Sequence, residues 1–291
     1  MKNIAIHGRK IKFTSFKEVK ALFHQLISRK IQLSVSSDFM SLNEVLLSDF
    51  LFDIYNPKRG KKNFDAFISI GGDGTFLETL THVGSLEIPI LGINTGRLGF
   101  LASIAQDQIR GAIDKLLIGD YEVEKRSLII LTSNIELFDG VNYGLNEFSI
   151  LRKDSSAMIV IKSYLNGDFL NSYWADGLMV STPTGSTGYS LSCGGPILLP
   201  ENENFIISPV SPHNLNIRPL IVPDTSEFSF EVESRTNNFL ISLDSRSQTV
   251  NDNIQMKVKK APFKAYLIKV GGLSFVETLR NKLSWGLDKR N

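Results

Sequence analysis

The stretch Phe64-Asp65-Ala66-Phe67-Ile68-Ser69-Ile70-Gly71-Gly72-Asp73-Gly74-Thr75 decides the fold of the first part of the chain. Residues 64–70 are mostly apolar, which is typical of a strand buried on both faces of a sheet. Glycines end this strand, and Phe76–Val83 then has the apolar spacing of a helix. A buried strand, a glycine turn and a helix indicate a parallel sheet covered by helices.

The glycine turn has the composition of a phosphate-binding loop. Gly71, Gly72 and Thr75 can present backbone N–H groups beside the positive end of the following helix. The spacing matches neither the dinucleotide fingerprint nor the P-loop. The embedded Asp73 could hold a divalent metal or accept a proton from an attacking hydroxyl. A bare Asp-Gly turn would only end a strand, but the three glycines between a strand and a helix favour the functional interpretation.

A second glycine turn, Gly92-Ile93-Asn94-Thr95-Gly96-Arg97-Leu98-Gly99-Phe100, follows the predicted strand Ile88–Ile93. Two such turns on neighbouring strands would line one crevice at the carboxyl edge of the sheet. Arg97 could contact phosphate there, although a solvated loop arginine is the commoner case. Asn94 could line the same loop or serve as an ordinary turn residue.

The rest of the chain divides into two regions that differ in predicted secondary structure. Before residue 120, predicted strands alternate with helices, among them Ser15–Lys30, whose Ser15 and Glu18 have the spacing of a capping box. After residue 121 short strands dominate, with Asn166-Gly167 as a hairpin turn and Arg235–Asn238 as a second hairpin tip. We therefore predict an α/β domain with a parallel sheet over 1–120, an antiparallel all-β domain over 121–272, and a C-terminal helix over 273–291 that returns to the first domain.

The densest polar segment lies in the predicted β domain. Residues 176–192 read Asp-Gly-Leu-Met-Val-Ser-Thr-Pro-Thr-Gly-Ser-Thr-Gly-Tyr-Ser-Leu-Ser. Hydroxyls and glycines at this density suit the sugar and planar parts of a nucleotide. A long surface loop is the alternative, but such loops usually carry more charge. Asn146-Glu147 ends another candidate strand and carries little meaning by itself.

Composition indicates a globular protein and excludes several classes. The chain has 291 residues, 42% of them hydrophobic and 21% charged, with a net charge of +2. This balance gives no support for binding nucleic acid or membrane, and no run approaches about 18 apolar residues. The single cysteine, Cys193, cannot form an internal disulfide. The segment Met1–Gly8 has no secretory pattern, so we expect a cytoplasmic location.

Taken together, the ordered segments resemble the NAD kinase family. The resemblance covers six segments: Gly71–Leu77, Gly92–Leu101, Leu145–Glu147, Asp176–Leu198, Pro212–Val222 and Phe275–Trp285. Gly-Gly-Asp-Gly-Thr alone is shared with diacylglycerol and sphingosine kinases. The run Thr182-Pro-Thr-Gly-Ser-Thr-Gly-Tyr-Ser190 is much more specific.

The resemblance implies transfer of the terminal phosphoryl group of ATP to the 2′-hydroxyl of the adenosine ribose of NAD, giving NADP. It implies a divalent cation, with Mg²⁺ expected, and assembly as a homodimer or homotetramer. By matching position, Asp73 is the proton acceptor. The residues matched to the dinucleotide site are Asp73, Gly74, Asn146, Glu147, Trp174, Asp176, Thr187, Gly188, Tyr189, Ser190, Leu191 and Ser192.

Two positions depart from the family pattern. Many members carry a basic residue two positions before Asp176, where this chain has Trp174. Many also read Asp-Gly-Gln or Asp-Ser-Gln where this chain has Asp244-Ser245-Arg246. A lipid kinase with the same glycine motif and a non-catalytic NADP-binding sensor are the alternatives; the hydroxyl-rich segment argues against the first, and the presence of Asp73 against the second.

Overall fold

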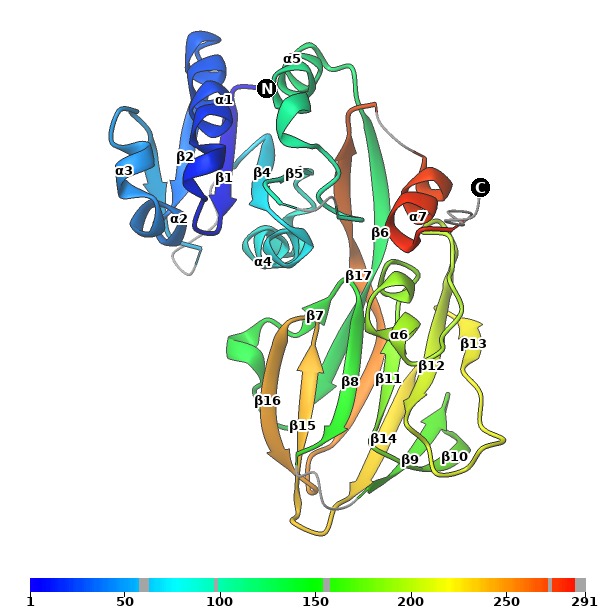
Figure 1. Ribbon diagram of the computed structural model, residues 1–291. Helices are drawn as coiled ribbons and strands as arrows, with labels where there is room; N and C mark the ends of the chain where they lie inside the picture. The colour runs from blue at the N-terminus through cyan, green and yellow to red at the C-terminus, as the bar shows by residue number, and fades with distance from the viewer. Residues whose placement is uncertain (58–62, 97–98, 154–157, 272–273, 286–291) are drawn as a thin grey trace. The chain divides into compact units, whose positions relative to one another are not determined.

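The computed structural model describes residues 1–57, 63–96, 99–153, 158–271 and 274–285 (Figure 1). The chain forms two compact units, one made of 1–125 with 265–291 and the other of 126–264. The backbone passes from one unit to the other within β6 (Glu122–Ser133) and returns within β17 (Met256–Lys269). Each unit has its own hydrophobic core.

The first unit is built on a parallel sheet. Its strands lie in the order β3-β2-β1-β4-β5, and Leu267 of β17 pairs in parallel with Ile90 of β5. The strands are β1 (Asn3–Gly8), β2 (Gln32–Ser36), β3 (Asp53–Tyr55), β4 (Ala66–Gly71) and β5 (Ile90–Asn94). The helices are α1 (Phe16–Ser28), α2 (Ser37–Leu42), α3 (Glu44–Leu47), α4 (Asp73–Val83), α5 (Ile109–Ile118) and α7 (Phe275–Leu283).

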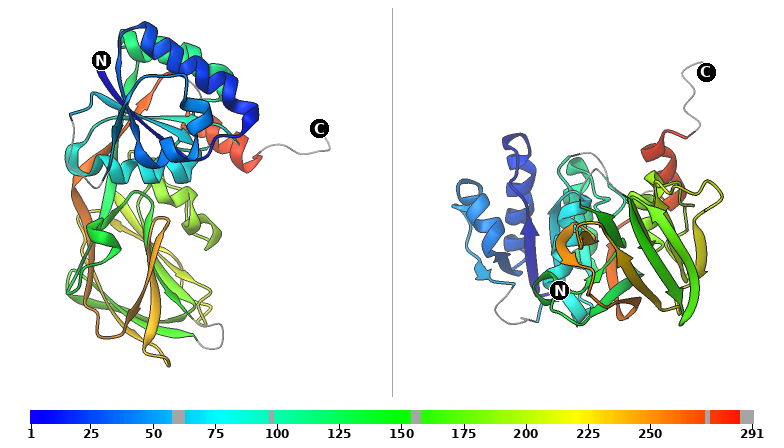
Figure 2. Two further views of the ribbon diagram at one scale, coloured as in Figure 1. Left: turned by 90° about the vertical axis from the view of Figure 1, so that its left-hand side faces the viewer. Right: turned by 90° about the horizontal axis from the view of Figure 1, so that it is seen from below.

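Helices cover both faces of this sheet, as the buried strands require. Successive side chains of a strand point to opposite faces. Ile4 and Ile6 of β1 belong to the core that includes α1 and α5, whereas His7 contacts α4 through Glu78. The left view of Figure 2 shows the blue α1 and green α5 on one side of the sheet and the cyan α4 on the other. The predicted parallel α/β architecture is confirmed.

The predicted capping box at the start of α1 is wrong. Ser15 is the N-cap residue, but its side chain makes no capping hydrogen bond. Residues Phe13–Ser15 form a 3₁₀ turn that leads directly into the helix, so Ser15 has φ −105° and ψ 5° instead of an extended backbone. The hydroxyl is therefore not aimed at the open N–H groups of the first turn. The capping box occurs instead in α7, between Ser274 and Glu277.

The second unit contains two antiparallel sheets. One runs β10-β9-β14-β17, with β6 pairing β17 and β7, and the other runs β13-β12-β11-β8-β15-β16. The first group of strands is β7 (Tyr143–Gly144), β9 (Ile159–Leu165), β10 (Asp168–Ala175) and β14 (Phe228–Glu233). The second is β8 (Glu147–Arg152), β11 (Gly177–Ser181), β12 (Asn204–Val210), β13 (Leu220–Pro223), β15 (Asn238–Leu243) and β16 (Arg246–Asn251).

The core of the second unit is filled from both of its sheets. Phe148 of β8 lies 5.9 Å from Phe230 of β14, measured between ring centroids, and both side chains are buried. Phe239 of β15 and Ile161 of β9 belong to the same cluster. Inward-facing apolar side chains from two sheets are the packing of a β sandwich. The predicted antiparallel β region is confirmed.

One of the two predicted hairpins is present. Asn166 and Gly167 both have positive φ, 53° and 92°, and join the paired strands β9 and β10. Residues 234–237 instead connect β14 to β15, which lie in different sheets and do not pair with each other. The hairpin predicted at Arg235–Asn238 is therefore wrong, because a turn sequence fixes the reversal of the chain but not the partner of the next strand.

The C-terminal helix α7 belongs to the first unit, as expected. The Phe275 ring lies 6.3 Å from the ring of Phe100, and Lys282 Nζ lies 5.7 Å from the same Phe100 ring. These contacts attach the helix to the end of the second glycine turn. Within the described ranges, no helix is both long enough and apolar enough to cross a membrane.

Candidate functional site

Asp73 binds the backbone of the second glycine turn. Its Oδ2 accepts a hydrogen bond from the N–H of Phe100 at 2.8 Å, and its Oδ1 accepts from Leu101 and Ala102 at 3.0 Å each. We call this arrangement the Asp73 clamp. A carboxylate oxygen has two acceptor positions, so Oδ2, with a single N–H donor, keeps one of them.

Glycines let the two turns approach. A Cβ on Gly99 would lie 1.8 Å from Asp73 Oδ1, and one on Gly71 would lie 2.2 Å from Thr75 Oγ1. Both distances are far shorter than real contacts, so a larger residue at either position must displace its neighbour. Gly72 and Gly74, by contrast, are exposed and have no neighbouring atoms within 4 Å of such a Cβ. The start of α4 therefore presents open backbone to an incoming group.

The two glycine turns leave adjacent strands, as expected. Gly71 pairs with Asn94 in the β4–β5 register, and the N–H of Thr95 donates to the Gly71 carbonyl at 3.3 Å. Asn94 is buried, and its Oδ1 accepts from the N–H of Gly96 at 2.6 Å. The structure thus brings the sequence-predicted Gly71–Thr75 and Asn94 together. Arg97 lies outside the described residues.

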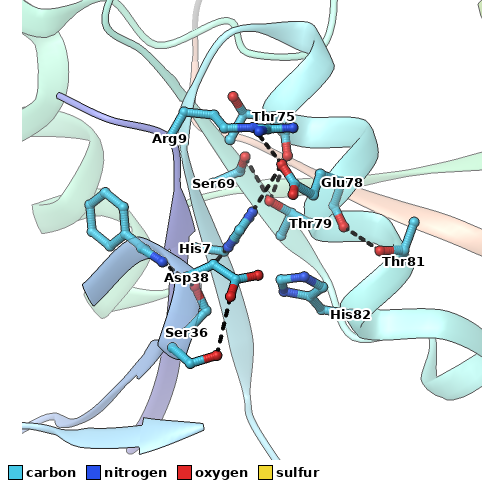
Figure 3. A network of polar contacts seen from close by, with 12 residues as sticks. His7, Arg9, Ser36, Asp38, Ser69, Thr75, Glu78, Thr79, Thr81 and His82 are labelled. Carbon is cyan, nitrogen blue, oxygen red and sulfur yellow. Dashed lines mark hydrogen bonds and ion pairs between the residues drawn. The ribbon is translucent and has the colours of Figure 1, made fainter. Parts of the chain in front are cut away.

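A polar cluster connects α4 to the neighbouring strands (Figure 3). His7 is 1% exposed; its Nδ1 lies 2.7 Å from Ser36 Oγ and its Nε2 lies 3.4 Å from Glu78 Oε2. Arg9 Nε reaches the same carboxylate oxygen at 2.7 Å, and the His7 contact lowers the pKa of Glu78. Burial lowers the pKa of His82 to about 3, so this ring is neutral. The cluster ties the helix that begins at Asp73 to β1 and β2.

The second unit contains a similar carboxylate arrangement at Asp244. Its Oδ2 accepts from the N–H of Leu145 at 2.8 Å, and its Oδ1 accepts from Asn146 at 2.7 Å and Glu147 at 3.2 Å. We call this the Asp244 clamp. Burial raises the pKa of Asp244, and the three N–H groups and the Arg246 charge counteract that rise.

Arg246 holds the segment immediately before the Asp244 clamp. Its Nη1 donates to the carbonyl of Val141 and its Nη2 to the carbonyl of Tyr143. The guanidinium carbon lies 5.8 Å from the centroid of the Phe138 ring. At this position of departure from the family pattern, the longer side chain therefore binds main-chain oxygens of its own unit.

Asn146 and Glu147 lie beside the hydroxyl-rich turn. The N–H of Thr182 donates to the Asn146 carbonyl at 2.9 Å, and a Cβ on Gly185 would lie 2.1 Å from that carbonyl oxygen. A Cβ on Gly188 would lie 3.5 Å from Glu147 Oε2. The structure therefore brings Asn146, Glu147 and the start of the 187–192 segment together, as the sequence interpretation required.

Glu147 has a strongly raised pKa. Burial, followed by the negative charge of Asp244, raises the pKa of Glu147 to about 8. Its Oε2 is buried and finds no hydrogen-bond partner among the described residues. At neutral pH the group is mostly protonated and can donate a hydrogen bond, for example to a ligand.

The remaining predicted residues are spread over the same unit. Asp176 Oδ1 lies 3.1 Å from Arg152 Nε. Burial, together with nearby negative groups that include Asp176, raises the pKa of Tyr189. The Trp174 side chain, on β10, is 57% exposed, so it does not fill the core. The segment 187–192 includes the short helix α6 (Tyr189–Ser192), in which Ser190 is buried with its Oγ 3.4 Å from Ser208 Oγ.

Sequence reasoning missed the residues that arrange these loops. The sequence marks Asp244 and Arg246 only as a departure from the family pattern, and nothing in it marks the N–H groups of residues 100–102. Asp244 has a φ of 53°, and a polar residue at a two-residue turn between strands is the signal that could have identified it. No local signal links it to Asn146, 98 positions away.

The residues described do not build a metal site of their own. Among them, no group of three or more His, Cys, Asp and Glu side chains is placed to hold a metal ion. The Asp73 carboxylate is engaged by three N–H donors. Metal ligation by the protein alone does not fit this arrangement.

The chain is similar to known proteins in both sequence and fold. Residues 55–121 match the ATP-NAD kinase N-terminal domain, and residues 145–270 match the ATP-NAD kinase C-terminal domain. A NAD kinase of Cytophaga hutchinsonii is 50% identical over 99% of both chains, and one of Flavobacterium psychrophilum is 45% identical over 99% of both.

Two solved structures share the fold. Yeast NADH kinase complexed with NADH has a TM-score of 0.87 at 20% identity, covering 99% of this chain and 89% of that one. An NAD kinase from Archaeoglobus fulgidus in complex with ATP has a TM-score of 0.75 at 23% identity, covering 98% and 99%. Likeness in sequence along nearly the whole length, together with this shared fold, leads to one conclusion: the chain belongs to the NAD kinase family.

Proposed function

We propose that this protein phosphorylates the 2′-hydroxyl of the adenosine ribose of NAD with ATP as donor, giving NADP. NAD kinase activity follows from the family, and the observation that carries it is the likeness to proteins named NAD kinase over 99% of the chain. The position of transfer on the ribose is the finer part of the proposal. It is supported by the retention of Asp73 and of the hydroxyl-rich segment.

We propose Asp73 as the general base. A ribose hydroxyl is a weak nucleophile, and a carboxylate within hydrogen-bond reach can take its proton as the new P–O bond forms. The Asp73 clamp fixes the carboxylate by three N–H donors and leaves Oδ2 with one acceptor position. That position is the one we assign to the proton of the acceptor hydroxyl.

The exposed backbone at the start of α4 is our proposed contact for the transferred phosphoryl group. Gly72 and Gly74 are open to solvent, and the positive end of the 11-residue helix favours a negative ligand. We assign Gly71, Gly72, Thr75, Asn94 and Arg97 to this loop. The first turn, residues 71–75, contains no lysine, so we assign its main-chain N–H groups as donors.

We propose that the dinucleotide is held in the second unit. The assigned residues are Asn146, Glu147, Trp174, Asp176 and 187–192, and Asp73 and Gly74 complete the assignment. Support comes from the contact of Asn146 and Glu147 with the 185–188 turn. A protonated Glu147 is suited to donate to a hydroxyl or carbonyl of NAD.

Mg²⁺ enters the proposal as part of the donor substrate. Mg²⁺ keeps several waters and is usually bound through substrate phosphates together with one or two carboxylates. Because the described residues do not gather into a metal site, no step of the chemistry is assigned to an ion held by the protein alone. The chain's own residues supply alignment, N–H donors and a base.

The experiment that tests the function is a coupled assay. The protein is incubated with ATP, MgCl₂ and NAD, and NADP is detected with an NADP-specific dehydrogenase. Formation of NADP that requires ATP is the expected result, and mass or NMR analysis of the product locates the phosphate on the ribose. No product together with tight NADP binding would overturn the proposal in favour of a sensor.

Location and assembly complete the proposal. We place the protein in the cytoplasm and expect a homodimer or homotetramer, as the family resemblance implies. Light scattering coupled to size-exclusion chromatography measures the mass against 32.5 kDa for one chain. A monomer at micromolar concentration would contradict the proposed assembly.

A further inference from the structure

The turn between β15 and β16 binds the backbone of residues 141–147 through both N–H groups and carbonyls of that segment. Asp244 accepts from three N–H groups at 145–147, and Arg246 donates to the carbonyls of Val141 and Tyr143. These contacts join residues about a hundred positions apart in the sequence. The held segment, 141–147, ends with Asn146 and Glu147.

We propose that Arg246 is a positioning residue for NAD, acting through the main chain of residues 141–147 without touching the ligand. The inference rests on the proposed function, in which Asn146 and Glu147 bind the dinucleotide. Arg246 fixes the first part of the segment, and Asp244 fixes the part that carries the two side chains. The directions of both side chains then depend on the two contacts together.

The packing around the turn explains why the two contacts depend on each other. A Cβ on Gly144 would lie 2.9 Å from Asp244 Oδ1, so the chain passes directly against the carboxylate. Gly144 follows the Tyr143 carbonyl that Arg246 binds. If that carbonyl moves, the Leu145 and Asn146 N–H groups on Asp244 move with it. The N–H of Phe138 donates to Gln248 Oε1 at 3.1 Å and holds the start of the loop to β16.

In this chain the guanidinium fork of Arg246 makes both carbonyl contacts. Its two terminal nitrogens donate to two different carbonyls, and a side chain with one terminal nitrogen does not reproduce that arrangement. A glutamine at 246 is shorter and neutral, and its single amide nitrogen cannot occupy the positions of both Nη1 and Nη2. A lysine keeps the charge beside Asp244 but loses the fork. The two substitutions therefore separate the effect of the charge from that of the geometry.

The test compares Arg246→Gln and Arg246→Lys with Arg235→Gln, a matched control at an exposed arginine of the same unit. KM for NAD, KM for ATP and kcat are measured, with the dissociation constant of NAD from calorimetry. Amide hydrogen exchange of residues 145–147 is measured on the full chain without substrate. Thermal unfolding shows that each variant is folded at the assay temperature.

We expect Arg246→Gln to raise KM and the dissociation constant for NAD at least about tenfold, the scale of one lost charge-assisted hydrogen bond. The KM for ATP should change less than about threefold, and exchange at 145–147 should accelerate by a similar factor of ten or more. Arg246→Lys should lie between wild type and Arg246→Gln, and Arg235→Gln should match wild type.

Three results would overturn the inference. Unchanged NAD affinity despite faster exchange at 145–147 would show that the contact is structural only. Unchanged exchange would show that Arg246 does not hold the segment. An equal loss of NAD and ATP affinity would indicate general destabilisation. Because exchange and calorimetry need no turnover, failure of this inference is distinguishable from failure of the proposed activity, which would appear as absence of NADP with the wild-type chain.

Discussion

The Asp73 clamp and the Asp244 clamp use the same hydrogen-bond pattern for different ends. In each, one carboxylate oxygen accepts from two N–H groups and the other from one. Asp73 stands at the start of α4 between exposed glycines. Asp244 lies in a left-handed turn with Arg246 close by. The same motif can thus present a carboxylate to a ligand or bury it as a support.

The largest expected effect is the loss of turnover when the Asp73 carboxylate is replaced by an amide. Asp73→Asn keeps the size of the side chain and loses the proton acceptor. Turnover should fall about 10²-fold or more while the protein remains folded, the usual scale for loss of an acid–base group. The coupled assay measures kcat, and circular dichroism checks the fold. Asp107→Asn, at an exposed position, is the control, and near-normal turnover of Asp73→Asn would remove Asp73 from the role of base.

The second prediction concerns stability. In Asp244→Asn an NH₂ group must face an N–H that the carboxylate accepted, so a buried donor loses its partner. The free energy of unfolding should fall by about 2 kcal/mol. Urea titration measures it, with Asp168→Asn, an exposed residue of the same unit, as the control. A loss no larger than that of the control would show that the Asp244 clamp contributes little to folding.

The third prediction disturbs the Asp73 clamp without changing its carboxylate. A Cβ at position 99 would lie 1.8 Å from Asp73 Oδ1, so Gly99→Ala must displace the carboxylate or the loop. We expect kcat to fall about tenfold, roughly 1.4 kcal/mol of activation free energy. Gly111→Ala, where the added Cβ meets open space, is the matched control. Equal activity of the two variants would mean that the exact carboxylate position is unimportant.

The last prediction concerns the pH dependence of stability and follows from Glu147. Its pKa of about 8 in the folded protein lies above the ordinary value of 4.5. The stabilisation from the bound proton is therefore full below the ordinary value and is lost as the pH rises through about 8. Between about pH 5 and pH 9, wild type should therefore lose stability relative to Glu147→Gln, which has no ionisable group at this position. Urea unfolding at both pH values measures this difference, and parallel pH curves would contradict the raised pKa.

Much of the fold was predictable because its signals are local. The buried strand at 66–71, the glycine turn and the helix α4 are contiguous, and the hairpin turn Asn166-Gly167 lies directly between its two strands. The Arg235–Asn238 hairpin was wrong because pairing between sheets depends on the whole sandwich. The capping box at Ser15 was wrong because a preceding 3₁₀ turn changed the backbone conformation.

The sequence predicts several residues of the candidate site but not the contacts that hold them in place. Asp73, Asn146 and Glu147 stand in recognisable motifs, whereas their supports do not. The partners of Asp73 lie 27 to 29 positions further along the chain and are main-chain N–H groups, which have no sequence signature. Arg246 binds carbonyls, which every residue possesses. Contacts to the main chain become visible only after the chain has folded.

The position of Cys193 allows the protein to be labelled at a single site beside the 187–192 segment. It is the sole thiol of the chain, and it is half-buried at the end of α6. Burial raises the pKa of Cys193, so alkylation should be slow near neutrality and faster in alkaline buffer. A fluorescent maleimide would label one place without mutagenesis. The rate of that labelling, with and without a dinucleotide, would then follow occupancy of the neighbouring turn in solution.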